Sequence, residues 1–144
     1  MPLEQLHAFT DAVLAMEAGP TTEPAALAFA FERLCGRLRQ RLEPLVGVNG
    51  VRALFGRALH LSKTDFPWLT RTELAPSPGC ALHRVPEATA GVDLFVVRQG
   101  LSAILGHDLS LLFTFIGDDL GLPLIYLAWP DARRFAELLR RDRT

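Results

Sequence analysis

The chain has 144 residues, a formal net charge of −1 and an isoelectric point near 6.4. Hydrophobic residues make up 49% of it and charged residues 22%, which is typical of a folded domain and excludes a disordered or fibrous protein. This length predicts one domain over 1–144, large enough to bury a core without a disulfide or a metal ion. The near-neutral charge argues against a general affinity for nucleic acid or for an anionic membrane.

The ends of the chain, its cysteines and its most apolar window together predict a cytoplasmic protein. Glu4 and Asp11 stand where a signal peptide carries basic residues, and two cysteines form at most one disulfide. The apolar window 109–128 has the length of a membrane span, but Asp118 and Asp119 lie near its centre, where each carboxylate costs roughly 2.5–3.5 kcal/mol. No membrane span is therefore expected. Arginine outnumbers lysine by 14 to 1, which suggests a GC-rich bacterial genome.

Helical periodicity dominates the first half of the chain. Apolar residues recur at three- and four-residue steps over 3–17 and again over 22–43, which predicts two amphipathic helices. Pro44 and Gly47 are expected to end the second of these helices. The apolar positions of a third predicted helix, 50–63, fall within one narrow arc at 100° per residue.

An irregular segment, 64–91, interrupts this pattern, and its length is typical of a functional or mobile loop. Helical periodicity returns over 93–117, where Asp108 falls in the middle of the apolar stripe. The phase of that stripe favours one unbroken helix with an acid on its inner face. The alternative is that Gly106 ends one helix and Asp108 caps the next.

Two shorter helices are expected at the end of the chain. Pro123 is suited to begin a helix that ends at Trp129, and Asp131 is suited to cap a last helix over 132–142. Only the run 124–129 has the composition of an extended segment, and no internal repeat is present. The predicted fold is an all-α, single-domain bundle of five or six helices with one long irregular loop at about 64–91.

Common catalytic motifs are absent, since the chain has no glycine-rich phosphate loop, GxSxG, HExxH or CxxC. His60 is the most suggestive single residue, because it points away from the apolar stripe of its helix beside Gly56 and Arg57. An accessible imidazole with a cation one turn away suits a phosphoacceptor. The four residues from His60 to Lys63 resemble the His-x-x-Lys core of histidine-phosphotransfer domains, and this resemblance implies a phosphocarrier with His60 as the acceptor.

Cys80 and His83 have the spacing of half a zinc site. The remaining ligands would have to come from His60, His107 or Cys35, so no metal site is predicted. No cofactor is predicted either.

The acidic and basic residues offer further candidates for a site. If Asp108 lies inside the bundle it needs a partner, because a buried unpaired carboxylate is costly. Arg98 or a histidine is the expected neighbour. Arg33, Arg37 and Arg41 form a basic stripe at i, i+4 and i+8. Without interleaved aromatic residues this stripe favours salt bridges, within the chain or to a partner protein, over nucleic-acid binding.

The last third of the chain carries more apolar surface than one helix face can bury. Phe95, Val96 and Phe113 lie off the main stripe, so the helix is apolar nearly all round, and a partner surface is expected. The sequence therefore predicts a non-catalytic regulatory or protein-interaction module that forms a homodimer. The alternatives are a helical sensor that binds a small apolar ligand and the phosphocarrier described above.

Overall fold

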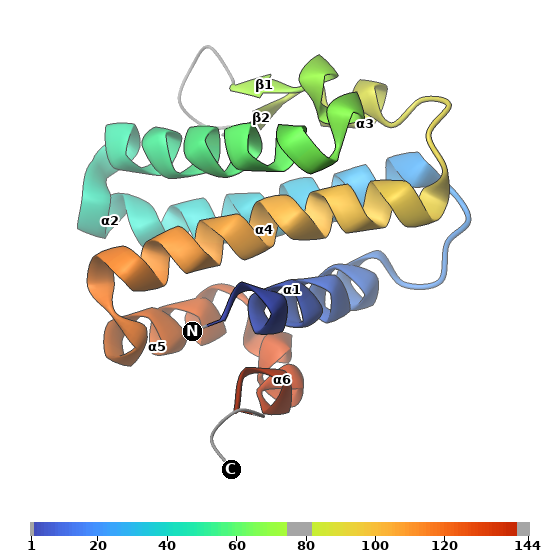
Figure 1. Ribbon diagram of the computed structural model, residues 1–144. Coiled ribbons are helices and arrows are strands. Elements are labelled where there is room, and N and C mark those ends of the chain that lie inside the picture. Colours follow the sequence, from blue (N-terminus) through green and yellow to red (C-terminus); the bar gives the residue numbers. More distant parts are fainter. Residues whose placement is uncertain (1, 75–81, 141–144) are drawn as a thin grey trace.

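The computed structural model of the protein describes residues 2–74 and 82–140. Within these ranges it confirms the all-α prediction, because six α-helices and two short 3₁₀ helices account for nearly all regular structure. Strands are confined, in the described residues, to β1 (Glu73–Leu74) and β2 (Leu82–His83), which pair antiparallel with Glu73 opposite His83. Figure 1 shows the long helices lying roughly side by side, with the strand pair above them.

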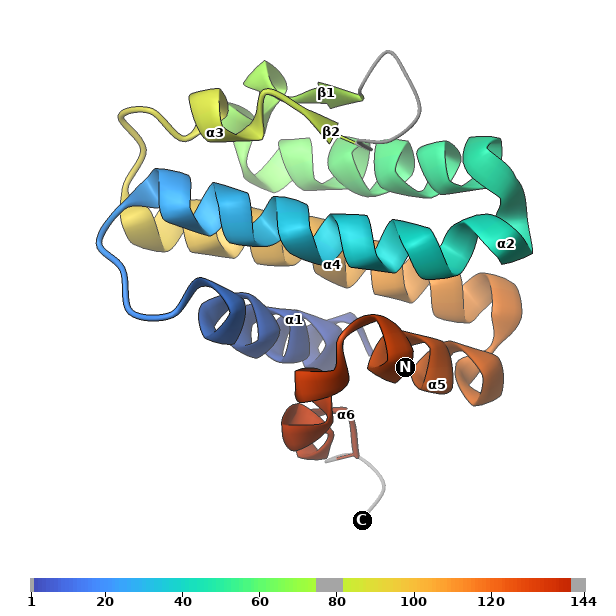
Figure 2. The same ribbon diagram turned by 180° about the vertical axis from the view of Figure 1, so that it is seen from behind.

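The first two helices follow the predicted periodicity. Helix α1 (Leu3–Ala18) ends at Gly19, whose φ of 69° favours glycine. Helix α2 (Pro24–Asp65) bends sharply at Gly47, which has φ 78° and ψ 168°. The bend separates a first arm (24–46) from a second arm (48–65), and Figures 1 and 2 show these arms folded back along each other. The two helices predicted over 22–43 and 50–63 are therefore the two arms of α2.

Helix α4 (Leu94–Ile116) is the central helix of the bundle and is unbroken, as the phase of its apolar stripe predicted. Asp93 caps its start by accepting hydrogen bonds from the backbone N–H groups of Phe95 and Val96 at 3.0 and 3.3 Å. It packs against α1, α2 and α5 (Figures 1 and 2). By length and composition α4 would be able to cross a membrane, but 61% of its most apolar stretch is buried inside the bundle, as in the core helix of a soluble protein.

The irregular segment predicted over 64–91 contains more order than expected. It begins with the 3₁₀ helix η1 (Pro67–Arg71) and continues into β1, β2 and the short helix α3 (Val85–Ala88). Leu69 is fully buried, and Trp68 lies against α4 so closely that a Cβ on Gly100 would meet its ring at 2.6 Å. This end of the segment thus packs on the helices.

The C-terminal elements differ from the sequence prediction. Helix α5 (Asp118–Ala128) begins directly after Gly117, whose φ of 84° ends α4, so Pro123 lies inside the helix and does not begin it. Acidic residues favour a first helical turn, and Asp118 and Asp119 occupy that turn. The helix predicted over 132–142 is instead the 3₁₀ helix η2 (Pro130–Phe135) followed by α6 (Glu137–Arg140).

Candidate functional site

Large apolar side chains are exposed at the end of the bundle where α2 bends and α4 connects to α5. Leu45 is 61% exposed, Phe115 75% and Leu120 67%, and Val48 next to the bend is 40% exposed. Figure 1 shows the bend of α2, the end of α4 and the start of α5 together at the left of the bundle. We call these four residues the bent-end patch. Exposed apolar residues that gather at one end of a folded domain are typical of binding surfaces.

A groove of about 500 Å³ adjoins the bent-end patch. The small residues Gly50 and Ala53 line the side formed by α2, whereas Leu111 and Phe115 line the side formed by α4. Arg57 is the one charged residue in the described lining. The complete lining is Leu45, Val46, Gly50, Ala53, Leu54, Arg57, Leu111 and Phe115. The groove is therefore apolar, with a cation at its margin.

The structure reverses the expected positions of two phenylalanines of α4. Phe113, predicted on the surface, is only 6% exposed, because α5 folds back over it and a Cβ on Gly121 would meet its ring at 2.2 Å. Phe115 belongs to the apolar stripe that the periodicity of 93–117 placed inward, yet it is 75% exposed, beside the groove between α4 and α2. Of the other two surface candidates, Phe95 is exposed and Val96 half-buried, both at the opposite end of α4.

No local pattern singled out Leu45, Val48 or Leu120 as surface residues. Leu45 and Val48 flank Gly47, and a helix break does not reveal which neighbours the bend leaves uncovered. Because a helix was expected to begin only at Pro123, Leu120 fell outside it, and the outward position of Leu120 on α5 was not predicted. A clue was available in that helix, because Leu120, Pro123 and Leu127 recur at three- and four-residue steps and are all exposed.

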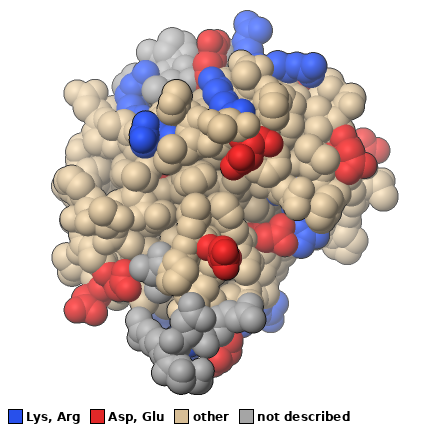
Figure 3. All heavy atoms as spheres, viewed as in Figure 1, with Lys and Arg blue, Asp and Glu red and all other residues tan. Residues whose placement is uncertain are grey.

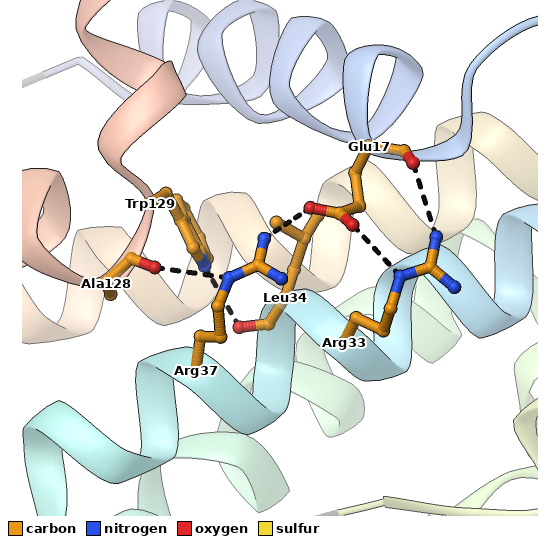
Figure 4. Close-up of polar contacts among 6 residues, drawn as sticks. All are labelled: Glu17, Arg33, Leu34, Arg37, Ala128 and Trp129. Atoms are coloured by element: carbon orange, nitrogen blue, oxygen red, sulfur yellow. Dashed lines mark hydrogen bonds and ion pairs between the residues drawn. The ribbon is translucent and has the colours of Figure 1, made fainter.

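The basic stripe on α2 is largely used within the chain, and Figure 4 shows its contacts. Arg33 donates from Nε to Glu17 Oε2 at 2.9 Å, and Arg37 donates to Glu17 Oε1 and, at 3.3 Å, to the carbonyl oxygen of Ala128. Although burial raises the pKa of Glu17, the hydrogen bonds from Arg37 and Arg33 outweigh it and hold that pKa below its usual value. Of the two uses expected for the stripe, Arg33 and Arg37 thus show the first, salt bridges within the chain. Arg41 is exposed.

Asp108 lies inside the bundle, as predicted, but without the predicted partner. Arg98 instead donates to both carboxylate oxygens of Asp11 on α1, at 2.7 and 2.8 Å. Asp108 is 3% exposed, and neither of its carboxylate oxygens has a hydrogen-bond partner. Burial therefore raises the pKa of Asp108 well above its usual value. This acid is a destabilising feature of the core.

Two histidines that the sequence analysis did not connect meet between α1 and α4. The rings of His7 and His107 are 5.5 Å apart between centroids in an edge-on arrangement. Gly106 allows this approach, because a Cβ there would lie 2.2 Å from the His7 ring. Burial lowers the pKa of both histidines, and His107 lowers that of His7 further. In the described part of the chain, no group of three or more potential ligands is placed to hold a metal ion.

Two sequence candidates keep their status as predictions. His60 is exposed on the second arm of α2, which leaves its ring accessible, and its role as a phosphoacceptor is not tested by the geometry. Cys80 lies outside the described residues, and only the backbone of His83 is described, in β2. The zinc half-site is thus neither supported nor contradicted. Cys35 is buried in the core.

Comparisons with models of known protein families, with curated proteins and with solved structures found no match to this chain. Function therefore has to be inferred from the arrangement of its own residues. Among the described residues, the bent-end patch contains the two most exposed large apolar side chains, Phe115 and Leu120.

Proposed function

We propose that this protein is a non-catalytic helical interaction module that self-associates through the bent-end patch. The observation that supports the proposal is the exposure of Leu45 and Phe115 on one apolar groove, together with the exposure of Leu120 in the first turns of α5. Water around such side chains is released when a partner covers them, which favours association by roughly 25 cal/mol for each Å² of apolar surface buried. Single exposed apolar residues need no explanation, but a cluster next to a groove favours a binding role.

The sequence pattern attributed self-association to the whole last third of the chain, whereas in the structure only the bent-end patch supports it. The accessible surface of 7522 Å² is close to the roughly 7400 Å² expected for a folded monomer of this mass. Most of the apolar residues of α4 are thus hidden within one chain. A standard interface removes about 800 Å² from each partner, about a tenth of this surface, so one end of the bundle is large enough to form it.

The proposal is tested by size-exclusion chromatography with light scattering at micromolar concentrations. The wild-type chain is expected to have about twice its mass of 15.9 kDa. A double variant, Phe115→Ser with Leu120→Ser, is expected to have the mass of one chain, since it removes the two most exposed side chains of the patch.

The matched control is Phe29→Ser with Phe95→Ser. These side chains are 52% and 63% exposed but lie near the starts of α2 and α4, at the end of the bundle away from the bend (Figure 1). The control is expected to keep the mass of the wild type. A monomeric wild type across the whole concentration range would contradict the proposal, as would equal loss of association in both double variants.

The groove also favours a second candidate function, the binding of a small apolar molecule. Its volume of about 500 Å³ lies within the range of roughly 300–1,000 Å³ that small-molecule sites occupy. Native mass spectrometry of the purified protein separates the two functions. A sensor would retain a small molecule as an added mass on one chain, whereas the interaction module would give two chains without added mass.

A further inference from the structure

We infer that the partner on the bent-end patch is a second copy of this chain, related by a two-fold axis, with Arg57 of each copy opposite Asp118 and Asp119 of the other. This inference rests on the proposed function and adds the orientation of the two copies and the residues that pair between them. It follows from the charges at the margins of the patch, which have opposite signs on its two sides.

The basic margin belongs to α2 and the acidic margin to α5. Arg57 is exposed and lines the groove from the second arm of α2. Asp118 and Asp119 form the first turn of α5, directly beside Leu120, and Asp119 is exposed. Of the ion pairs found within the described ranges, none involves any of these three residues. Both margins thus keep their charges available for a partner.

Figure 3 shows the same arrangement on the surface of the molecule. On the left part of this face, uncharged atoms separate Lys and Arg atoms above, over α2, from Asp and Glu atoms at the lower left, where α5 begins. Other Asp and Glu atoms lie in the middle and at the right of the same view. A two-fold axis that lies in the plane of the interface, between these two margins, brings each margin against the opposite margin of the second copy. The same patch is then used by both subunits, which is the property of an interface with two-fold symmetry.

The shape of the patch also suits a second copy. Phe115 and Leu45 are mostly exposed next to the groove, while the small side chain of Ala53 lines its α2 side. One surface therefore provides both protruding side chains and a hollow to receive them. A partner of different sequence would need an acidic margin, an apolar surface and a basic margin in the same order. A second copy of this chain already has these three features in that order. Its net charge of −1 also opposes the approach of two copies only weakly.

Charge reversal with mixing tests the arrangement. In Arg57→Glu homodimers the introduced glutamate faces Asp119 of the other copy, and in Asp119→Arg homodimers the introduced arginine faces Arg57. Each variant alone is expected to dimerise about ten-fold more weakly than the wild type or worse, because like charges across an interface are strongly unfavourable. Sedimentation equilibrium measures this change.

A mixture of the two variants should recover the association. Both contacts of the mixed dimer join opposite charges, so a heterodimer is expected at close to the wild-type affinity and is recognised by its mass in native mass spectrometry. Misfolding of either variant would not produce this recovery. Arg134→Glu serves as the control, since it makes the same charge change on η2, where Arg134 lies next to Met16 of α1.

The outcomes distinguish this inference from the proposed function. If the wild type dimerises while neither reversal weakens it and the mixture shows no preference for the heterodimer, the two-fold arrangement is wrong and the interaction module stands. If the wild type is monomeric, both are wrong.

Discussion

Replacing Trp129 by alanine is expected to lower the free energy of unfolding by about 3–5 kcal/mol. Trp129 is only 2% exposed and is the largest of the fully buried side chains. Its indole Nε1 donates a hydrogen bond to the carbonyl oxygen of Leu34 at 3.0 Å (Figure 4), which joins the end of α5 to the first arm of α2. The substitution removes this hydrogen bond and leaves a cavity where three elements meet.

The effect is measured by urea unfolding, followed by far-ultraviolet circular dichroism. Trp129→Phe is the matched variant, because it keeps most of the apolar volume and loses mainly the hydrogen bond, at an expected cost of about 0.5–1.5 kcal/mol. A loss below about 1 kcal/mol for the alanine variant would show that α5 contributes little to the stability of the bundle.

Replacing Asp108 by asparagine is expected to raise the free energy of unfolding at pH 7 by about 1–3 kcal/mol. In the unfolded chain the carboxyl group ionises near pH 3.9, but burial raises its pKa in the folded chain. The unfolded state therefore releases this proton first, and the contribution of Asp108 to stability falls as the pH rises from about 4 toward the folded pKa. Asparagine has nearly the same shape and no proton to release.

Unfolding measured from pH 4 to pH 8 tests this linkage. The stability difference between Asp108→Asn and the wild type should be small near pH 4 and grow as the pH rises. His7 and His107 titrate in both proteins. Their contributions therefore cancel when the free energy of unfolding of the wild type is subtracted from that of the variant. Asp131→Asn, at an exposed position, is the control and should change stability by less than about 0.5 kcal/mol. A difference that does not vary with pH would contradict an ionising acid in the core.

The largest elements of this fold were predictable because their signals are local. Apolar spacing located α1, both arms of α2 and the unbroken α4, and the phase of the stripe in α4 even placed Asp108 on the inner face. Such spacing reflects the 3.6-residue turn of the helix, which is set within a few residues of chain. Glycine breaks were equally local, since Gly19, Gly47 and Gly117 all adopt a positive φ.

The surface candidates were less predictable, because exposure depends on which distant element arrives to cover a residue. Arg98 had a plausible partner in Asp108 on its own helix, yet Asp11 on α1 lies closer to its guanidinium. Phe113 and Phe115 exchanged roles because α5 folds back over the first, whereas none of the described helices covers the second.

Sequence alone thus determined α1, both arms of α2, the unbroken α4 and the buried acid, since these follow from short-range geometry. Tertiary structure alone decided which arginines are neutralised by Glu17, that His7 meets His107, and that the uncovered apolar surface lies at the bend of α2. The physical reason is that a helix face is defined by its own few turns, whereas its neighbours are brought to it by the folding of the whole chain.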